Sequence, residues 1–171
     1  MVKLTGNKKI NIAVFISGRG SNLRNLIKFA HSKRFKVKIN LVISDNSMAK
    51  GLSFAKKFKI KFKIINYKSV KKAENNILKL LNQNNIHLVC LAGFMRILSS
   101  NFIKKFKGKI INIHPSLLPK YKGLNTHHRA IKNKEKFSGC TIHFVNEKLD
   151  SGKIILQKKV KILKLDTPES L

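Results

Sequence analysis

The sequence predicts an α/β fold in which helices flank a doubly wound, mostly parallel sheet. Apolar, β-branched runs alternate with amphipathic helical patterns along most of the chain, an alternation that is typical of βαβ units. Several runs are nearly continuous, which indicates strands covered on both faces. The length of 171 residues is enough for one domain with a substantial core.

The first βαβ unit shows the pattern most clearly. Residues 11–17 form an apolar run, residues 18–22 contain two glycines, and Leu23, Leu26 and Ile27 recur at helical spacing. Further elements follow in the same alternation. We expect strands at 38–44, 62–65, 87–92, 109–114, 139–145 and 154–160, and helices at 48–58 and 69–82, with two more that end near 106 and 133.

The formal net charge is +30, from 37 basic and 7 acidic residues. Such a charge is typical of proteins that bind nucleic acids. The alternative is that it reflects a general bias of the amino-acid composition toward lysine. Only five of the 37 basic residues are arginine, and the lysines are spread along the chain without interleaved aromatic residues. We therefore favour the compositional reading and expect no specific nucleic-acid partner, although the charge should attract anionic small molecules.

Three features bear on the compartment. No apolar run approaches the roughly 20 residues of a membrane span, and residues 1–9 lack the layout of a signal peptide. The two cysteines, Cys90 and Cys140, lie in apolar runs without the spacing of metal ligands. We expect a cytoplasmic protein with reduced cysteines, no bound metal and no membrane partner.

A glycine turn between the first strand and the first helix is a candidate anion site. The segment Gly18 to Asn22 places backbone N–H groups and the positive end of a helix dipole together, which suits a phosphate. A dinucleotide fingerprint would need a third glycine, and that position is Leu23. The turn therefore fits mononucleotide-type phosphate binding, with a plain tight turn as the alternative.

An amide and an imidazole share one face at the end of a later strand. Strand side chains alternate, so Asn112 and His114 point to the same side, and Pro115 ends the sheet pairing after them. An amide can donate to an oxyanion, and a histidine can exchange a proton near neutral pH. The alternative is a buried pair that is hydrogen-bonded to a neighbouring loop. Asp150 is a turn former by itself and becomes relevant only where the fold brings it to His114.

Five segments, taken in order, resemble phosphoribosylglycinamide formyltransferase, the folate-dependent family of purine synthesis. The resemblance runs from about Asn11 to the last residue. Its motifs are SGRGSNL at 17–23, LAGFMRILS at 91–99, NIHPSLLPKYKG at 112–123, GCTIHFV at 139–145 and LDSGKIILQ at 149–157.

The resemblance implies transfer of a formyl group from 10-formyltetrahydrofolate to the amino group of glycinamide ribonucleotide. It implies a Rossmann-like sheet with a late antiparallel strand, small-molecule substrates, no metal, and a monomer or homodimer. It also implies three groups of site residues: catalytic Asn112, His114 and Asp150; phosphate-binding Gly20, Ser21 and Asn22; and folate-binding Met95, Arg96, Ile97, Leu98, Asn112 and Val145.

Comparison with the family pattern shows where this sequence differs from it and which other functions remain as alternatives. Family members continue past Leu171 with a further helix, so we expect residues 1–171 to be a single formyltransferase domain that lacks its C-terminal helix. Two related formyl enzymes, methionyl-tRNA formyltransferase and formyltetrahydrofolate deformylase, share the Asn-x-His and Asp arrangement. A non-catalytic nucleic-acid or anion-binding module is the alternative from a different class of function.

Overall fold

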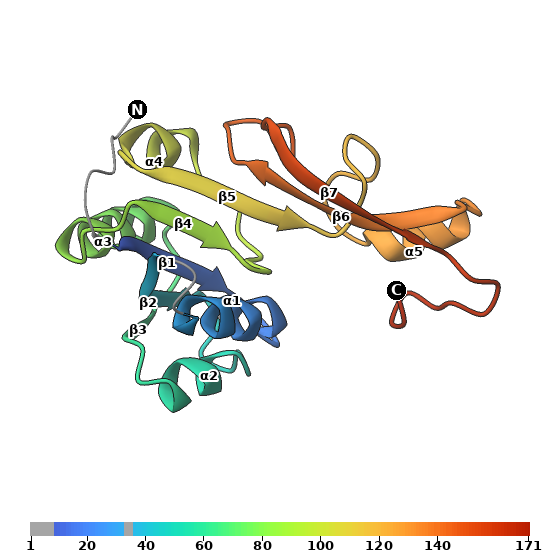
Figure 1. Ribbon diagram of the computed structural model, residues 1–171. Coiled ribbons are helices and arrows are strands. Elements are labelled where there is room, and N and C mark those ends of the chain that lie inside the picture. The colour runs from blue at the N-terminus through green and yellow to red at the C-terminus, as the bar shows by residue number, and fades with distance from the viewer. Residues whose placement is uncertain (1–8, 33–35) are drawn as a thin grey trace. The chain divides into compact units, whose positions relative to one another are not determined.

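The computed structural model describes residues 9–32 and 36–171. The strands form a seven-stranded sheet in the order β3-β2-β1-β4-β5-β6-β7 (Figure 1). The elements in chain order are β1 (Ile10–Ile16), α1 (Ser21–His31), β2 (Val37–Ser44), α2 (Leu52–Lys57), β3 (Phe62–Ile64), α3 (Val70–Gln83), β4 (Leu88–Leu91), α4 (Ser100–Lys105), β5 (Lys109–His114), α5 (Thr126–Lys132), β6 (Phe137–Phe144) and β7 (Ile154–Lys161).

The chain divides into two compact units, residues 1–110 and 111–171. In the first, β1 pairs in parallel with β2 and β4, and β2 pairs in parallel with β3. The side chains from Ala13 to Ile16 are fully buried, as the continuous apolar run predicts for a strand covered on both faces. Leu23 and Ile27 of α1 are also fully buried. The parallel doubly wound arrangement is thus confirmed for these strands.

The second unit carries the antiparallel part of the sheet. Strand β6 runs antiparallel to both β5 and β7, which confirms the expected late antiparallel strand. In the register of β5 and β6, Asn112 lies opposite His143, and His114 lies opposite Thr141. This pairing decides which polar side chains of the two strands lie next to each other.

One predicted helix is shorter than expected. The pattern predicted a helix at 48–58, but α2 begins at Leu52. The side chain of Asn46 accepts a hydrogen bond from the backbone N–H of Met48 at 2.9 Å, which forms a turn that competes with the first helical turn. In the described part of the chain, no helix is long and apolar enough to cross a membrane.

Two glycines let the backbone pack tightly beside the first glycine turn. Gly20 has a φ of 77°, and a Cβ atom on it would lie 2.4 Å from the Cα atom of Gly51. The backbone N–H of Gly51 donates to the carbonyl of Gly18 at 3.0 Å. Because only glycine combines the left-handed conformation with this close approach, the residue before α1 is restricted to glycine.

Candidate active site

A pair of facing side chains on β5 and β6 begins the site in the second unit. The Nδ2 atom of Asn112 lies 3.3 Å from Nε2 of His143. The Nδ1 atom of His143 lies 2.9 Å from the carbonyl oxygen of Phe144. A carbonyl can only accept, so Nδ1 carries a proton, and in the neutral ring Nε2 is left as an acceptor. In that neutral form the Asn112 amide donates to Nε2.

His114 ends β5 and is 5% exposed. Its Nε2 atom lies 2.8 Å from the backbone carbonyl oxygen of Tyr121, so this nitrogen donates. Its Nδ1 atom faces the carboxylate of Asp150, with 3.4 Å to Oδ2. The carbonyl of Tyr121 thus assigns one ring nitrogen as a donor, and the carboxylate stabilises positive charge on the ring.

Asp150 stands between two histidines. Its Oδ2 accepts a hydrogen bond from the backbone N–H of Gly123 at 2.9 Å, and its Oδ1 lies 3.6 Å from Nε2 of His143. The residue has a φ of 44°, an unfavourable conformation for a side-chain-bearing residue and one that recurs at functional sites. The left-handed turn places a carboxylate against both rings.

The electrostatics of this cluster follow from burial and mutual contact. Burial acts to raise the pKa of Asp150, but the contacts with His143, the Gly123 N–H and His114 outweigh it and hold the pKa below the ordinary value of 3.8. Burial also acts to lower the pKa of His143, yet the contacts with Asp150 and with the Phe144 carbonyl raise the pKa above its ordinary value of 6.5. The carboxylate is therefore ionised at neutral pH.

The candidate catalytic residues predicted from the sequence are Asn112, His114 and Asp150. In the second unit these three side chains lie in one cluster. Sequence reasoning treated His143 only as a packed strand residue that supports the site, and it missed the backbone groups of Tyr121 and Gly123. Contacts made by backbone groups leave no side-chain signature in a sequence. Gly123 itself was the only sequence feature that could have indicated this loop contact.

The candidate phosphate residues lie at the start of α1 in the first unit. Gly20 is the N-cap residue, and no side chain caps the described helix there. Ser21 is exposed and Asn22 is half-buried. Because the first backbone N–H groups of a helix lack intrahelical partners, this terminus keeps donors for an anion.

The candidate folate segment follows β4 in the first unit. Met95 and Ile97 are 64% and 74% exposed, whereas Leu98 is buried. The Nε atom of Arg96 lies 2.6 Å from Oδ2 of Asp45, and the backbone N–H of Met95 donates to Ser17 Oγ at 2.8 Å. The segment therefore presents exposed apolar side chains while two hydrogen bonds fix its backbone and its arginine.

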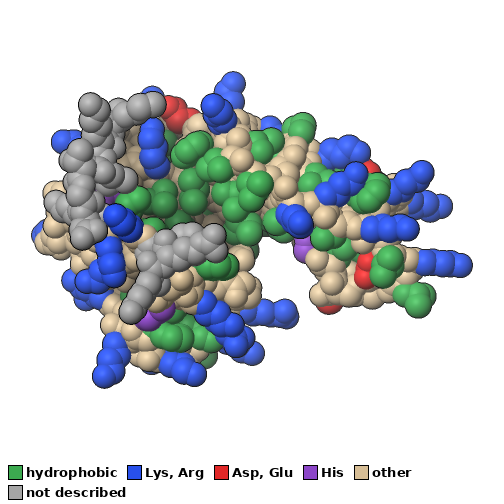
Figure 2. Space-filling model, viewed as in Figure 1, with side chains coloured by type: hydrophobic (Ala, Val, Ile, Leu, Met, Phe, Trp, Pro, Cys, Tyr) green, Lys and Arg blue, Asp and Glu red, His purple; other side chains and the backbone are tan. Residues whose placement is uncertain are grey.

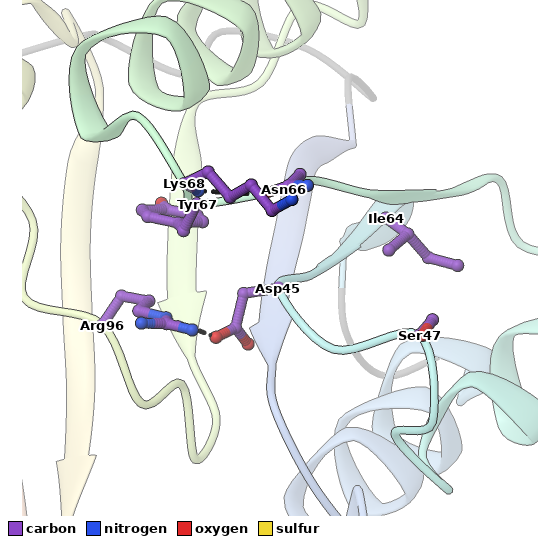
Figure 3. A pocket seen from close by; sticks show the side chains of 7 residues that line it. All are labelled: Asp45, Ser47, Ile64, Asn66, Tyr67, Lys68 and Arg96. Carbon is purple, nitrogen blue, oxygen red and sulfur yellow. Dashed lines mark hydrogen bonds and ion pairs between the residues drawn. The ribbon is translucent and has the colours of Figure 1, made fainter.

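A cavity of about 500 Å³ lies beside this arginine. Figure 3 shows the Arg96 side chain directed at Asp45, with Tyr67 and Lys68 on another wall. The guanidinium carbon of Arg96 is 5.6 Å from the centroid of the Tyr67 ring. The cavity is lined by Asp45, Ser47, Ile64, Asn66, Tyr67, Lys68 and Arg96. The pairing of Asp45 with Arg96 was not predicted from the sequence.

The remaining candidate residue, Val145, is half-buried and directly follows β6 in the second unit. The chain turns back soon afterwards at Gly152, where an added Cβ atom would lie 1.7 Å from the carbonyl oxygen of Phe144. Among the described residues, no group of three or more His, Cys, Asp or Glu side chains could hold a metal ion.

The sequence matches the family model described as formyl transferase over residues 10–171. The chain belongs to the formyl transferase family. It is 44% identical over 163 residues to phosphoribosylglycinamide formyltransferase of Haemophilus influenzae, which covers 94% of this chain and 77% of that protein. It is also 44% identical over 167 residues to the human trifunctional purine biosynthetic protein adenosine-3.

The match covers 96% of this chain but only 16% of the human trifunctional protein. Solved structures of the formyl transferase family agree with the fold. The phosphoribosylglycinamide formyltransferase of Anaplasma phagocytophilum superposes with a TM-score of 0.89 at 44% identity, over 95% of this chain and 77% of that one. Glycinamide ribonucleotide transformylase 1 of Symbiobacterium toebii gives 0.92 at 35% identity, over 99% and 81%.

Proposed function

We propose that this chain transfers a formyl group from 10-formyltetrahydrofolate to the amino group of N1-(5-phosphoribosyl)glycinamide in de novo purine biosynthesis. The observation that carries the proposal is the cluster of Asn112, His114 and Asp150 in the second unit. The names of the relatives, at up to 44% identity, support the same substrates.

The cluster offers the groups that such a transfer requires. The substrate amine attacks the formyl carbon, so a new C–N bond forms and the carbonyl oxygen gains negative charge. Asn112 has a second amide N–H beyond the one directed at His143, and this N–H is the donor offered to the oxygen. Both ring nitrogens of His114 face protein acceptors, so a positively charged His114 would stabilise the oxyanion by its charge. Each donor aimed at a developing oxyanion contributes typically about 3 kcal/mol to catalysis.

Asp150 provides the matching negative charge. Its carboxylate stabilises the imidazolium of His114 and orients the ring together with the Tyr121 carbonyl. When the tetrahedral intermediate collapses, the bond from the formyl carbon to the folate nitrogen breaks. The proton released by the amine is then passed, through His114 and Asp150, to that leaving nitrogen.

The first unit supplies the proposed binding residues. Gly20, Ser21 and Asn22 would hold the substrate phosphate at the N-terminus of α1. We propose Met95, Arg96, Ile97 and Leu98 as folate-binding residues of this unit. Asn112 and Val145 are the folate-binding residues proposed in the second unit. The exposed apolar side chains of Met95 and Ile97 fit an aromatic ring system, and Arg96 fits an anionic group.

A competition assay tests this proposal. The chain is given 10-formyltetrahydrofolate with glycinamide ribonucleotide, initiator methionyl-tRNA or neither acceptor. We expect formylation of the ribonucleotide only. Formyl transfer to the tRNA, or hydrolysis without an acceptor, would instead favour the two related formyl enzymes. Absence of any turnover by the chain, with the H. influenzae relative active beside it, would favour a non-catalytic module.

Further features remain part of the proposal. The family match from residue 10 to 171 supports one formyltransferase domain. We also propose a cytoplasmic monomer or homodimer, for which the two free cysteines are suited to a reducing compartment. On the face in Figure 2 the Lys and Arg side chains are scattered, which favours small anionic substrates over one specific nucleic acid.

A further inference from the structure

We propose that His143 is a positioning residue that holds the Asn112 amide in the one orientation in which its nitrogen, and not its oxygen, faces the ring. This inference rests on the proposed function of Asn112 as an oxyanion donor. His143 lies outside the three proposed catalytic residues. Its contact determines which Asn112 atoms remain free to bind the substrate.

The two nitrogens of the His143 ring have different partners. The Phe144 carbonyl, 2.9 Å from Nδ1, requires a proton on that nitrogen. In the neutral ring Nε2 then has only a lone pair to offer. The Asn112 amide, with Nδ2 at 3.3 Å, can satisfy this lone pair only with its N–H end, because its oxygen is an acceptor.

The strand pairing makes this contact rigid. Asn112 and His143 are register partners on β5 and β6, and His143 is 2% exposed. Water therefore has little access to the ring, and a flipped amide would place two acceptors against each other in a buried setting. Such a mismatch is costly, so the amide orientation is well determined while the ring is neutral.

Protonation of His143 would remove this control. The protonated Nε2 can no longer accept from Asn112 and donates instead toward Oδ1 of Asp150, 3.6 Å away. Among the described residues, Asp150 is the only carboxylate within ion-pair distance of the ring. On β5, His114 reaches the same carboxylate, and β7 places the uncharged Ile154 opposite His143. The neutral ring is thus the state that orients the amide.

The test compares His143→Gln with His143→Phe. A glutamine oxygen can still accept from Asn112 but does not titrate, whereas phenylalanine cannot accept. We expect His143→Phe to lower kcat by about 10-fold, the value of one hydrogen bond to the amide, with KM changed less than about 2-fold. His143→Gln should recover most of this loss in kcat. Its kcat should also decline less at acidic pH than that of the wild type. His128→Gln, on the exposed side of α5, is the matched control.

A spectroscopic measurement on the wild-type protein keeps the inference independent of activity and of variant folding. In ¹⁵N-labelled protein, the Asn112 side-chain amide signals should shift along the same pH curve as the His143 ring nitrogens. The inference is overturned if the chemical shifts of the Asn112 amide do not change as His143 titrates. It is also overturned if His143→Gln is as slow as His143→Phe. Absence of formyl transfer by the wild type would refute the proposed function and leave the amide measurement valid.

Discussion

The Oδ2 atom of Asp150 lies 3.4 Å from Nδ1 of His114, while Oδ1 of the same carboxylate lies 3.6 Å from Nε2 of His143. One ionised group therefore serves two imidazole rings in a buried cluster. Because a carboxylate stabilises the protonated form of a neighbouring ring, the ionisations of Asp150 and His143 depend on each other. The stability and the activity of the protein should both depend on this coupling.

Stability should pass through a maximum in the weakly acidic range. Folding raises the pKa of His143, so its contribution is complete below pH 6.5 and is lost as the pH rises through the raised pKa. Folding lowers the pKa of Asp150, so its contribution is complete above pH 3.8 and is lost as the pH falls through the lowered pKa. Both contributions are present between these values.

Urea unfolding of the wild type and of His143→Gln at a series of pH values measures the histidine part. The difference in unfolding free energy between the two proteins should shrink as the pH rises above 6.5. If the two plots of unfolding free energy against pH remain parallel over this range, folding does not raise the pKa of the His143 ring.

Substitution of the amide on β5 should slow the chemical step. Asn112→Ala removes one donor to the developing oxyanion, and we expect kcat to fall by about 100-fold to 1,000-fold. Asn76→Ala, at an exposed position of α3, is the matched control and should turn over at the wild-type rate. A KM change with kcat intact would assign Asn112 to ground-state binding instead.

The glycine that precedes α1 should tolerate no side chain. Gly20→Ala combines a left-handed φ of 77° with a Cβ atom 2.4 Å from the Gly51 Cα, and we expect a loss of about 2–3 kcal/mol in unfolding free energy. Gly18→Ala is the control, since its Cβ atom would have no neighbour within 4 Å. Thermal unfolding distinguishes the two, and equal melting temperatures would contradict the packing argument.

The proposed phosphate site predicts an effect on binding alone. Ser21→Ala should raise KM for the ribonucleotide by about 5-fold to 10-fold, because one hydrogen bond to a charged group is lost, with kcat little changed. The same substitution should have no effect with a substrate analogue that lacks the phosphate. An equal effect on both substrates would place Ser21 elsewhere in the mechanism.

The sequence predicted much of the fold because its strands are strongly apolar and its helices strongly periodic. The run before Gly18 became β1, and the period-two pattern placed Asn112 and His114 on one face of β5. The length of α2 was misjudged, because the Asn46 turn competes with its first residues through a side-chain contact that periodicity does not register.

The completed cluster could not be derived from local pattern. The contact between Asp150 and His114 depends on the left-handed turn after β6, and the contact between Asn112 and His143 depends on strand register. The ion pair of Arg96 with Asp45 joins residues that are distant in sequence. Only the family resemblance pointed to Asp150 in advance, and it did not identify the backbone partners.

The central claim is that His114 and Asp150 carry the formyl transfer. The most direct measurement is the steady-state rate of formylation of glycinamide ribonucleotide by His114→Ala and Asp150→Asn beside the wild type and His128→Ala. We predict that both site variants lose about 100-fold or more in kcat while folding normally and that the control does not change. Turnover at the wild-type rate by either site variant would contradict the account.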